Sequence, residues 1–138
     1  MRILLLALLG LTVSTARSTD LKVTVNGVAA PQGQVLIGVF TNSSNFRVQP
    51  QEGSAMIPIS RPGSVSHVVS GLRPGHYAIV AFWDKNKNGV LDTGAFGRPT
   101  EPFVFSNNPS TRFGPPKFQD CAIAIGEGGG RLVMNLGL

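Results

Sequence analysis

The chain has 138 residues and a formal net charge of +5, and 14% of its residues are charged while 42% are hydrophobic. This apolar fraction excludes a disordered chain, and the content of 17 glycines and 10 prolines excludes a helical bundle. The single cysteine excludes an internal disulfide and a cysteine-built metal site. The basic residues form no stripe interleaved with aromatics, so nucleic-acid binding is not expected.

Residues 1–18 have the features of a secretory signal peptide. The basic Arg2 is followed by an apolar run over residues 3–13 and by a small-residue cleavage pattern at residues 14–16. The run is too short for a transmembrane span, which needs roughly 20 residues. We therefore expect a secreted or periplasmic protein whose residues 19–138 form a single domain without a transmembrane segment.

The first half of this domain contains two predicted strands and a long loop. Residues 21–25 alternate apolar and polar side chains, as a half-buried strand does, and residues 35–40 are almost continuously apolar, as in a central strand. A turn rich in glycine joins them over residues 27–33. Residues 41–63 carry several prolines, so we expect a long loop with at most a short edge strand near residues 56–57.

The second half predicts shorter strands separated by turns. Residues 64–70 form a mixed strand, a Pro-Gly turn follows, and residues 76–83 are the most apolar run of the domain and a predicted central strand. Further strands are expected at residues 103–105, 121–125 and 131–136, the last two joined as a hairpin by the glycine-rich residues 126–130. No segment shows helical periodicity with caps.

This pattern predicts an all-β fold, an antiparallel two-sheet sandwich of about seven strands. Strand parity places one set of apolar side chains in its interior. These are Leu21, Val23, Val35, Ile37, Val39, Ile79, Ile123, Leu132 and Met134. Cys121 and a half-buried His67 are expected to be structural, and His76 is expected at the surface. The stretch 106–120, with Phe113 and Phe118, is interpreted as a loop latched onto the sandwich.

An ordered series of short motifs resembles known families. The segment GLRPGHY at residues 71–77 looks like the turn and strand of transthyretin-like and carboxypeptidase-regulatory-like sandwiches. It is followed by WDKNKNGVLD at residues 83–92, FGRPTE at 96–101, FSN at 105–107 and GPPKF at 114–118. The whole series resembles the secreted bacterial family called domain of unknown function 2141. This resemblance implies an exported Ig-like or prealbumin-like sandwich with no established activity.

Residues 84–92, termed the Asx loop, carry the pattern of a Ca²⁺-binding loop. Calcium takes six to eight oxygen ligands, which alternate loop residues supply from one side. Positions 1, 3, 5 and 9 hold Asp84, Asn86, Asn88 and Asp92, while Gly89 stands at position 6 and the carbonyl of Val90 at position 7. Ala95 replaces the bidentate glutamate of position 12, and Glu101 is the nearest residue that could complete the ligand shell.

Two other interpretations of the Asx loop stay open. Asn88-Gly89 is also typical of a tight hairpin turn, and Lys85 and Lys87 oppose a bound cation. Alternatively, Asp84, Asp92 and Glu101 could form an acid/base set acting on a glycan, although nothing fixes the separation of two carboxylates. Neither histidine lies in the nucleophile-elbow pattern of a hydrolase.

The sequence therefore predicts an exported, non-enzymatic binding or structural module with a candidate Ca²⁺ site. The alternative is a carrier that binds a small ligand or a protein through its long loops, and a carbohydrate-active enzyme ranks below both. The partner, whether a protein or a glycan, is not specified by the sequence.

Overall fold

Eight strands and two short helical segments make up the described part of the chain. The structure, a computed structural model, describes Gly10 and residues 19–47 and 54–137, so the predicted signal peptide, apart from Gly10, lies outside the described residues. The strands are β1 (Thr19–Val28), β2 (Gln34–Phe40), β3 (Ala55–Pro58), β4 (Gly63–Leu72), β5 (Gly75–Asp84), β6 (Phe103–Phe105), β7 (Ile123–Ile125) and β8 (Gly130–Asn135). The helical segments are η1 (Ala95–Gly97) and α1 (Phe118–Cys121).

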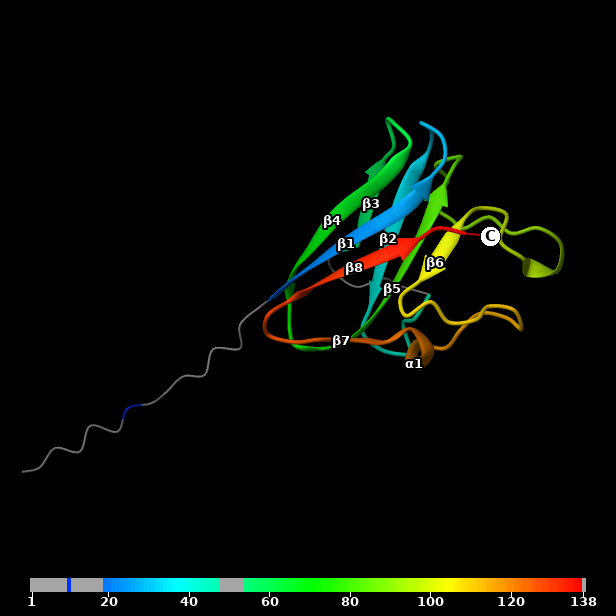
Figure 1. The fold of residues 1–138 in the computed structure, drawn as a ribbon. Helices are drawn as coiled ribbons and strands as arrows, with labels where there is room; N and C mark the ends of the chain where they lie inside the picture. The colour runs from blue at the N-terminus through cyan, green and yellow to red at the C-terminus, as the bar shows by residue number, and fades with distance from the viewer. Residues whose placement is uncertain (1–9, 11–18, 48–53, 138) are drawn as a thin grey trace, which may run out of the picture.

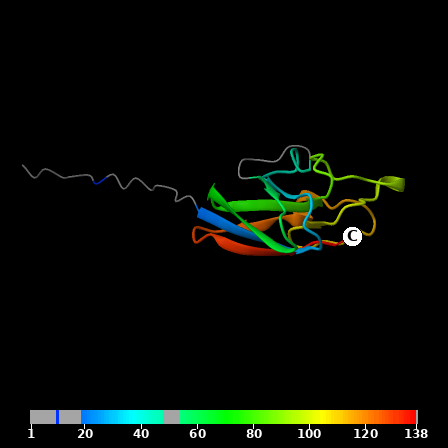
Figure 2. The same ribbon diagram turned by 90° about the horizontal axis from the view of Figure 1, so that it is seen from above.

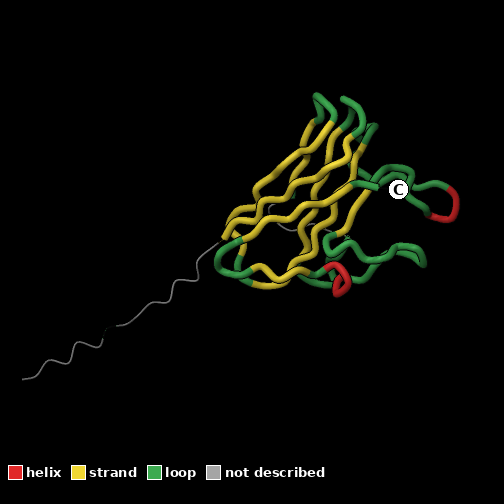
Figure 3. Tube along the Cα trace, in the orientation of Figure 1, coloured by secondary structure: helices red, strands yellow, loops and turns green. Residues whose placement is uncertain are grey.

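The strands form two sheets that face each other (Figures 1 and 2). The three-stranded sheet has the order β4-β1-β8, and the five-stranded sheet has the order β3-β2-β5-β6. The short strand β7 also pairs with β5, at residues 75–77. The predicted all-β two-sheet sandwich is confirmed, with β5 as a central strand and β3 as the short edge strand expected near residues 56–57. Figure 3 shows how little helix interrupts the strands.

Two details of the predicted topology are wrong. The sandwich is not wholly antiparallel, because β8 runs parallel to β1, with Val23 opposite Leu132. The strands β7 and β8 also form no hairpin, because β7 pairs with β5 and β8 pairs with β1. The glycine-rich residues 126–130 therefore carry the chain from one sheet to the other. Two strands joined by a short glycine-rich segment are predicted as a hairpin, but the local sequence does not indicate which sheet each strand joins.

The apolar core between the sheets follows the predicted strand parity. Seven of the nine residues expected inside have at most 2% of their surface exposed, and Ile123 and Leu132 are partly buried and packed against the same core. Both exceptions belong to strands with a neighbour on one side only, where less of each side chain is covered. Trp83 and Tyr77 add their rings to this core, so β5 contributes along its whole length.

A second apolar cluster covers the outer face of the five-stranded sheet. It contains Phe40, Phe46, Ala78, Phe105 and Cys121, with Phe118 packed against it. The predicted strand over residues 121–125 is wrong at its start, because Cys121 ends the helical turn α1, in which Asp120 Oδ2 accepts the Lys117 amide at 3.0 Å. The thiol is nevertheless fully buried, as expected. The sheet is therefore covered on both faces around β5.

The C-terminal end of the chain links the two sheets. After β8, Gly137 exchanges two backbone hydrogen bonds with Phe103 of β6, at 2.9 and 3.2 Å. The chain end consequently lies beside β6, as Figure 1 shows. Within the described ranges no helix has the length and apolar character needed to cross a membrane.

Candidate functional site

The Asx loop begins where β5 ends, and the register of two strands fixes its start. Asp84 is the last residue of β5 and lies opposite Gln34, the first residue of β2. The preceding turn passes very close to this point, because Gly33 has a φ of +72° and leaves no room for a Cβ beside the backbone of Asp84 and Lys85. The β-sheet thus anchors one end of the loop rigidly.

The carboxylate of Asp84 organises the loop from inside. Its side chain is fully buried, and Gln34 Nε2 donates to Oδ2 at 2.8 Å. The backbone amides of Asn88 and Gly89 donate to Oδ1 at 3.2 Å and to Oδ2 at 2.9 Å. A buried carboxylate needs such donors, because an unpaired buried charge is strongly unfavourable. Asp84 therefore closes residues 84–89 into a turn.

The side chains of Asn86, Asn88 and Asp92 meet at the outer side of this turn. Asn86 Nδ2 lies 2.6 Å from Asp92 Oδ2, and Asn88 Nδ2 lies 2.7 Å from Asp92 Oδ1. These hydrogen bonds, the one from Asn88 first, hold the pKa of Asp92 below its ordinary value of 3.8. The amide oxygens face the other way: Asn86 Oδ1 accepts the Asn88 amide at 3.3 Å, and Asn88 Oδ1 accepts the Val90 amide at 3.1 Å.

Glu101 braces the base of the loop. It is 4% exposed, and its oxygens accept the backbone amides of Lys85 at 2.7 Å and Asp92 at 3.0 Å. The carbonyl of Asp92 in turn accepts the Thr100 amide at 2.8 Å and the Thr100 hydroxyl at 3.2 Å. The Glu101 carboxylate thus ties both ends of the Asx loop to the segment that leads into β6.

The structure brings together most of the residues predicted as calcium ligands. One hydrogen-bonded group contains Asp84, Asn86, Asn88 and Asp92. Glu101 is joined to the same loop through the backbone amides of Lys85 and Asp92. Val90 turns its side chain to solvent, with 61% exposed. Within residues 19–47 and 54–137, no three His, Cys, Asp or Glu side chains converge into a metal-binding group. Calcium ligation here would accordingly depend on the asparagine and backbone oxygens as well as the carboxylates.

Gln34 and Gly33 belong to this site but were missed from the sequence. Both lie about fifty residues before the loop, and only the antiparallel pairing of β2 with β5 brings them to Asp84. The signal that was present is the polar Gln34 directly before the apolar run of residues 35–40. A polar residue at the end of a buried strand predicts a polar partner there, but it does not identify that partner.

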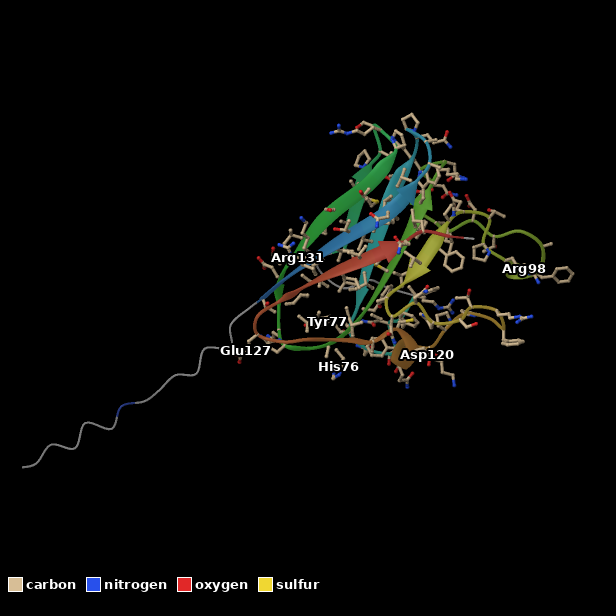
Figure 4. The ribbon with its side chains drawn as sticks, in the orientation of Figure 1. His76, Tyr77, Arg98, Asp120, Glu127 and Arg131 are labelled. Carbon is tan, nitrogen blue, oxygen red and sulfur yellow. The ribbon has the colours of Figure 1, made fainter. Side chains whose placement is uncertain are left out.

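The remaining predicted positions divide into buried and exposed ones. His67 is half-buried on β4, and His76 is exposed on β5, where Figure 4 labels it next to the buried Tyr77. The Tyr77 hydroxyl donates to the Arg73 carbonyl at 2.7 Å. Of the two aromatics in residues 106–120, only Phe118 packs on the sandwich, because Phe113 is 96% exposed. The expectation of a fully latched loop is therefore wrong at Phe113.

One further concave region lies between β6 and β8. It is a cleft of about 280 Å³ lined by residues 104–108 and 132–135, from the edges of the two sheets. Its lining mixes apolar strand residues with Asn107, Asn108 and Asn135. The cleft does not include any residue of the Asx loop.

Comparison with known proteins places the chain in a family. A family model described as "Uncharacterized protein conserved in bacteria (DUF2141)" matches residues 23–132. The chain belongs to the DUF2141 family. No curated protein and no solved structure matches it significantly.

The DUF2141 match extends from β1 into β8 and so includes both sheets and the entire Asx loop. It confirms the resemblance that the motifs between residues 71 and 118 indicated. The family description names no activity, so the role of this DUF2141 chain has to be argued from its own residues.

Proposed function

We propose that the protein is an exported, non-enzymatic β-sandwich module whose Asx loop binds one Ca²⁺ ion. The observation that carries the proposal is the convergence of Asp84, Asn86, Asn88 and Asp92 on one hydrogen-bonded group at the end of a rigid strand. These are the side chains at positions 1, 3, 5 and 9 of a calcium-loop pattern, and Ca²⁺ favours carboxylate and amide oxygens.

Calcium binding would require a small local change. The two asparagine amides present nitrogen to Asp92, and rotation of each amide about its last bond would present oxygen instead. The cation would then take the place that the two NH₂ groups occupy between the side chains. Lys85 opposes the ion less than its sequence position suggests, because its ammonium group lies over the Trp83 ring, 4.8 Å from the centroid.

The expected affinity is modest, because position 12 lacks its glutamate. We expect a Kd of about 10⁻⁴ to 10⁻³ M, the range of extracellular calcium modules. By mass action, about 5 mM Ca²⁺ would then stabilise the fold by about 1–2 kcal/mol. This corresponds to a rise in Tm of about 4–10 °C for a domain of this size. Mg²⁺ should substitute poorly, because it demands a tighter octahedral shell.

Isothermal titration calorimetry and thermal melts in Ca²⁺ and in EDTA test the proposal. Asp92→Asn keeps the shape of the side chain and removes its charge, so this variant should lose the calcium-dependent rise in Tm. Asp20→Asn, at an exposed position on β1, is the matched control and should retain it. Absence of both heat and a Tm shift in the wild type at about 5 mM Ca²⁺, several times the expected Kd, would leave the loop as a structural turn only.

The carboxylates of the loop support a binding role better than a catalytic one. A glycosidase acid needs a raised pKa, whereas the pKa of Asp92 is lowered by its asparagine partners. Asp84 and Glu101 direct their oxygens at backbone amides, which uses them to hold the chain. We therefore expect no turnover on a panel of glycosides and esters, and measurable turnover lost in Asp92→Asn would contradict this.

Export is the second part of the proposal and has its own test. The pattern of residues 1–18 predicts cleavage that leaves a mature N-terminus between Arg17 and Asp20. N-terminal sequencing of the protein from the periplasm or medium should find that start. Recovery of chains that begin at Met1 in a membrane fraction would contradict it.

A second candidate function is the binding of a small ligand in the cleft between β6 and β8. The observation that favours it is the cleft volume of about 280 Å³, at the small end for a ligand site. Saturable binding of a small apolar fluorophore, lost when Leu132→Trp fills the cleft, would support this function. Retention of that binding in the variant would exclude the cleft as its site.

A further inference from the structure

Two loops extend from the same side of the sandwich, beyond the ends of the strands. The first, the η1 loop, comprises residues 93–99 and contains η1; the second, the β6–α1 loop, comprises residues 106–117. Figures 1 and 2 show both of them reaching outward on the side of the molecule away from β4. Arg98 is labelled on the η1 loop in Figure 4.

Each loop presents one phenylalanine to solvent. Phe96 is 101% exposed and Phe113 is 96% exposed, whereas the other exposed large apolar residues of the described chain have at most 66% of their surface exposed. Isolated exposed apolar side chains are ordinary, but two fully exposed aromatic rings on neighbouring protruding loops are not. These rings contribute nothing to either core cluster, so packing does not explain them.

The η1 loop is built to hold its ring outward. Thr93 pairs with Pro99 as an isolated bridge, and the Gly94 amide donates to the Arg98 carbonyl at 2.7 Å. Phe96 itself has a φ of +59°, a left-handed conformation that is unfavourable for a residue with a Cβ. Strain of this kind persists where the surrounding structure fixes it, and it is frequent at functional sites.

The two loops that carry these rings are basic. The η1 loop carries Arg98, and the β6–α1 loop carries Arg112 and Lys117; all three side chains are exposed. Neither loop contains an acidic residue; the acidic residues that flank them along the chain are the half-buried Asp92, the buried Glu101 and the exposed Asp120. The Arg112 guanidinium lies 5.8 Å from the centroid of the Phe113 ring, so a charge and an aromatic group are presented together.

We propose that the η1 loop and the β6–α1 loop dock the protein on an anionic lipid surface. The two rings would enter the boundary between headgroups and acyl chains, and the basic side chains would contact the lipid phosphates. A bilayer fits this arrangement because it closes around separate convex tips, whereas a protein partner would need two matching pockets. The three basic residues of the two loops, with no acidic residue beside them in either loop, give a charge complementary to the anionic lipid.

Co-sedimentation of the mature chain with vesicles tests the proposal, with EDTA present so that the Asx loop plays no part. Vesicles of phosphatidylglycerol and phosphatidylethanolamine should bind the protein, and neutral phosphatidylcholine vesicles should bind it at least tenfold more weakly. Each of Phe96→Ser and Phe113→Ser should weaken binding by about tenfold, which corresponds to burial of much of one ring. Arg98→Ser should weaken it by about fivefold, the effect of one basic residue near an anionic membrane.

Val68→Ser is the matched control, because Val68 is 47% exposed on β4, away from both loops, and its replacement should leave binding unchanged. A second readout uses Phe113→Trp, whose emission should shift to shorter wavelength on anionic vesicles, while Met56→Trp on β3 should show no shift. Binding that survives the combined Phe96→Ser and Phe113→Ser substitutions would overturn the proposal. Absence of binding to any vesicle would overturn it as well and would direct the search to a protein partner.

Discussion

Gly33→Ala tests whether the close approach of the β1–β2 turn to the Asx loop is essential. A Cβ at residue 33 would overlap the carbonyl oxygen of Asp84 and lie 2.7 Å from Cα of Lys85. Because these are backbone atoms, relief requires a shift of the strand end and of the loop that it anchors. The left-handed backbone costs about 1–2 kcal/mol for alanine, and the overpacking adds about 1–3 kcal/mol. The variant should therefore lose about 2–5 kcal/mol of stability.

Gly71→Ala separates these two contributions. Gly71 has a φ of +75°, nearly that of Gly33, but a Cβ there would meet nothing within 4 Å. It should therefore cost only the backbone part, about 1–2 kcal/mol. Urea unfolding can be followed through Trp83, the only tryptophan, which is buried and donates to the Gln32 carbonyl at 2.9 Å. Equal losses in the two variants would show that the contact with the Asx loop is not tight.

Three other predictions concern the core, the thiol and acid stability. Ile79→Ala should cost about 2–5 kcal/mol in urea unfolding, because the side chain is fully buried, whereas Met56→Ala on the exposed face of β3 should cost less than about 0.5 kcal/mol. Burial raises the pKa of the Cys121 thiol to about 11, so the native protein should react with a thiol reagent only after denaturant is added. Because the pKa of Asp92 is lower in the folded protein than in the unfolded chain, its carboxylate stabilises the fold fully above its unfolded-state pKa. This stabilisation is lost as the pH falls through the pKa of the folded state. Melts of wild type and Asp92→Asn should thus converge in acid.

The strands and their buried faces could be predicted because period-two alternation reports burial directly. Residues 21–25 obey it, and in the almost continuously apolar residues 35–40 the same parity separates the interior set, Val35, Ile37 and Val39, from Phe40 in the outer cluster. Cys121 also obeyed it, but its strand was wrong, since the Lys117 amide and the Asp120 carboxylate close a helical turn there. Burial and secondary structure are separate properties, and parity alone does not distinguish a buried turn from a buried strand.

The candidate site was predictable in its local part only. The alternation of Asp84, Asn86 and Asn88 identified a loop in which polar side chains meet, because those residues are neighbours along the chain. The direction of each amide was not predictable, since it depends on the backbone amides of Asn88 and Val90. The contribution of Gln34 was also hidden, because pairing between strands far apart in sequence is set by the whole sheet.

The parallel pairing of β1 with β8 determines when the three-stranded sheet can be completed during synthesis. β1 makes no ladder with β2; its neighbours are β4 and β8, and the Asn26–Asn135 contact spans 109 residues. As the chain emerges N-terminus first, β1 therefore gains β4 as a partner midway along the sequence, but its other edge stays unpaired until β8 has been synthesised. Such long-range closure slows folding. The same pairing that joins both ends of the sandwich thus delays completion of the three-stranded sheet until the C-terminal strand is available.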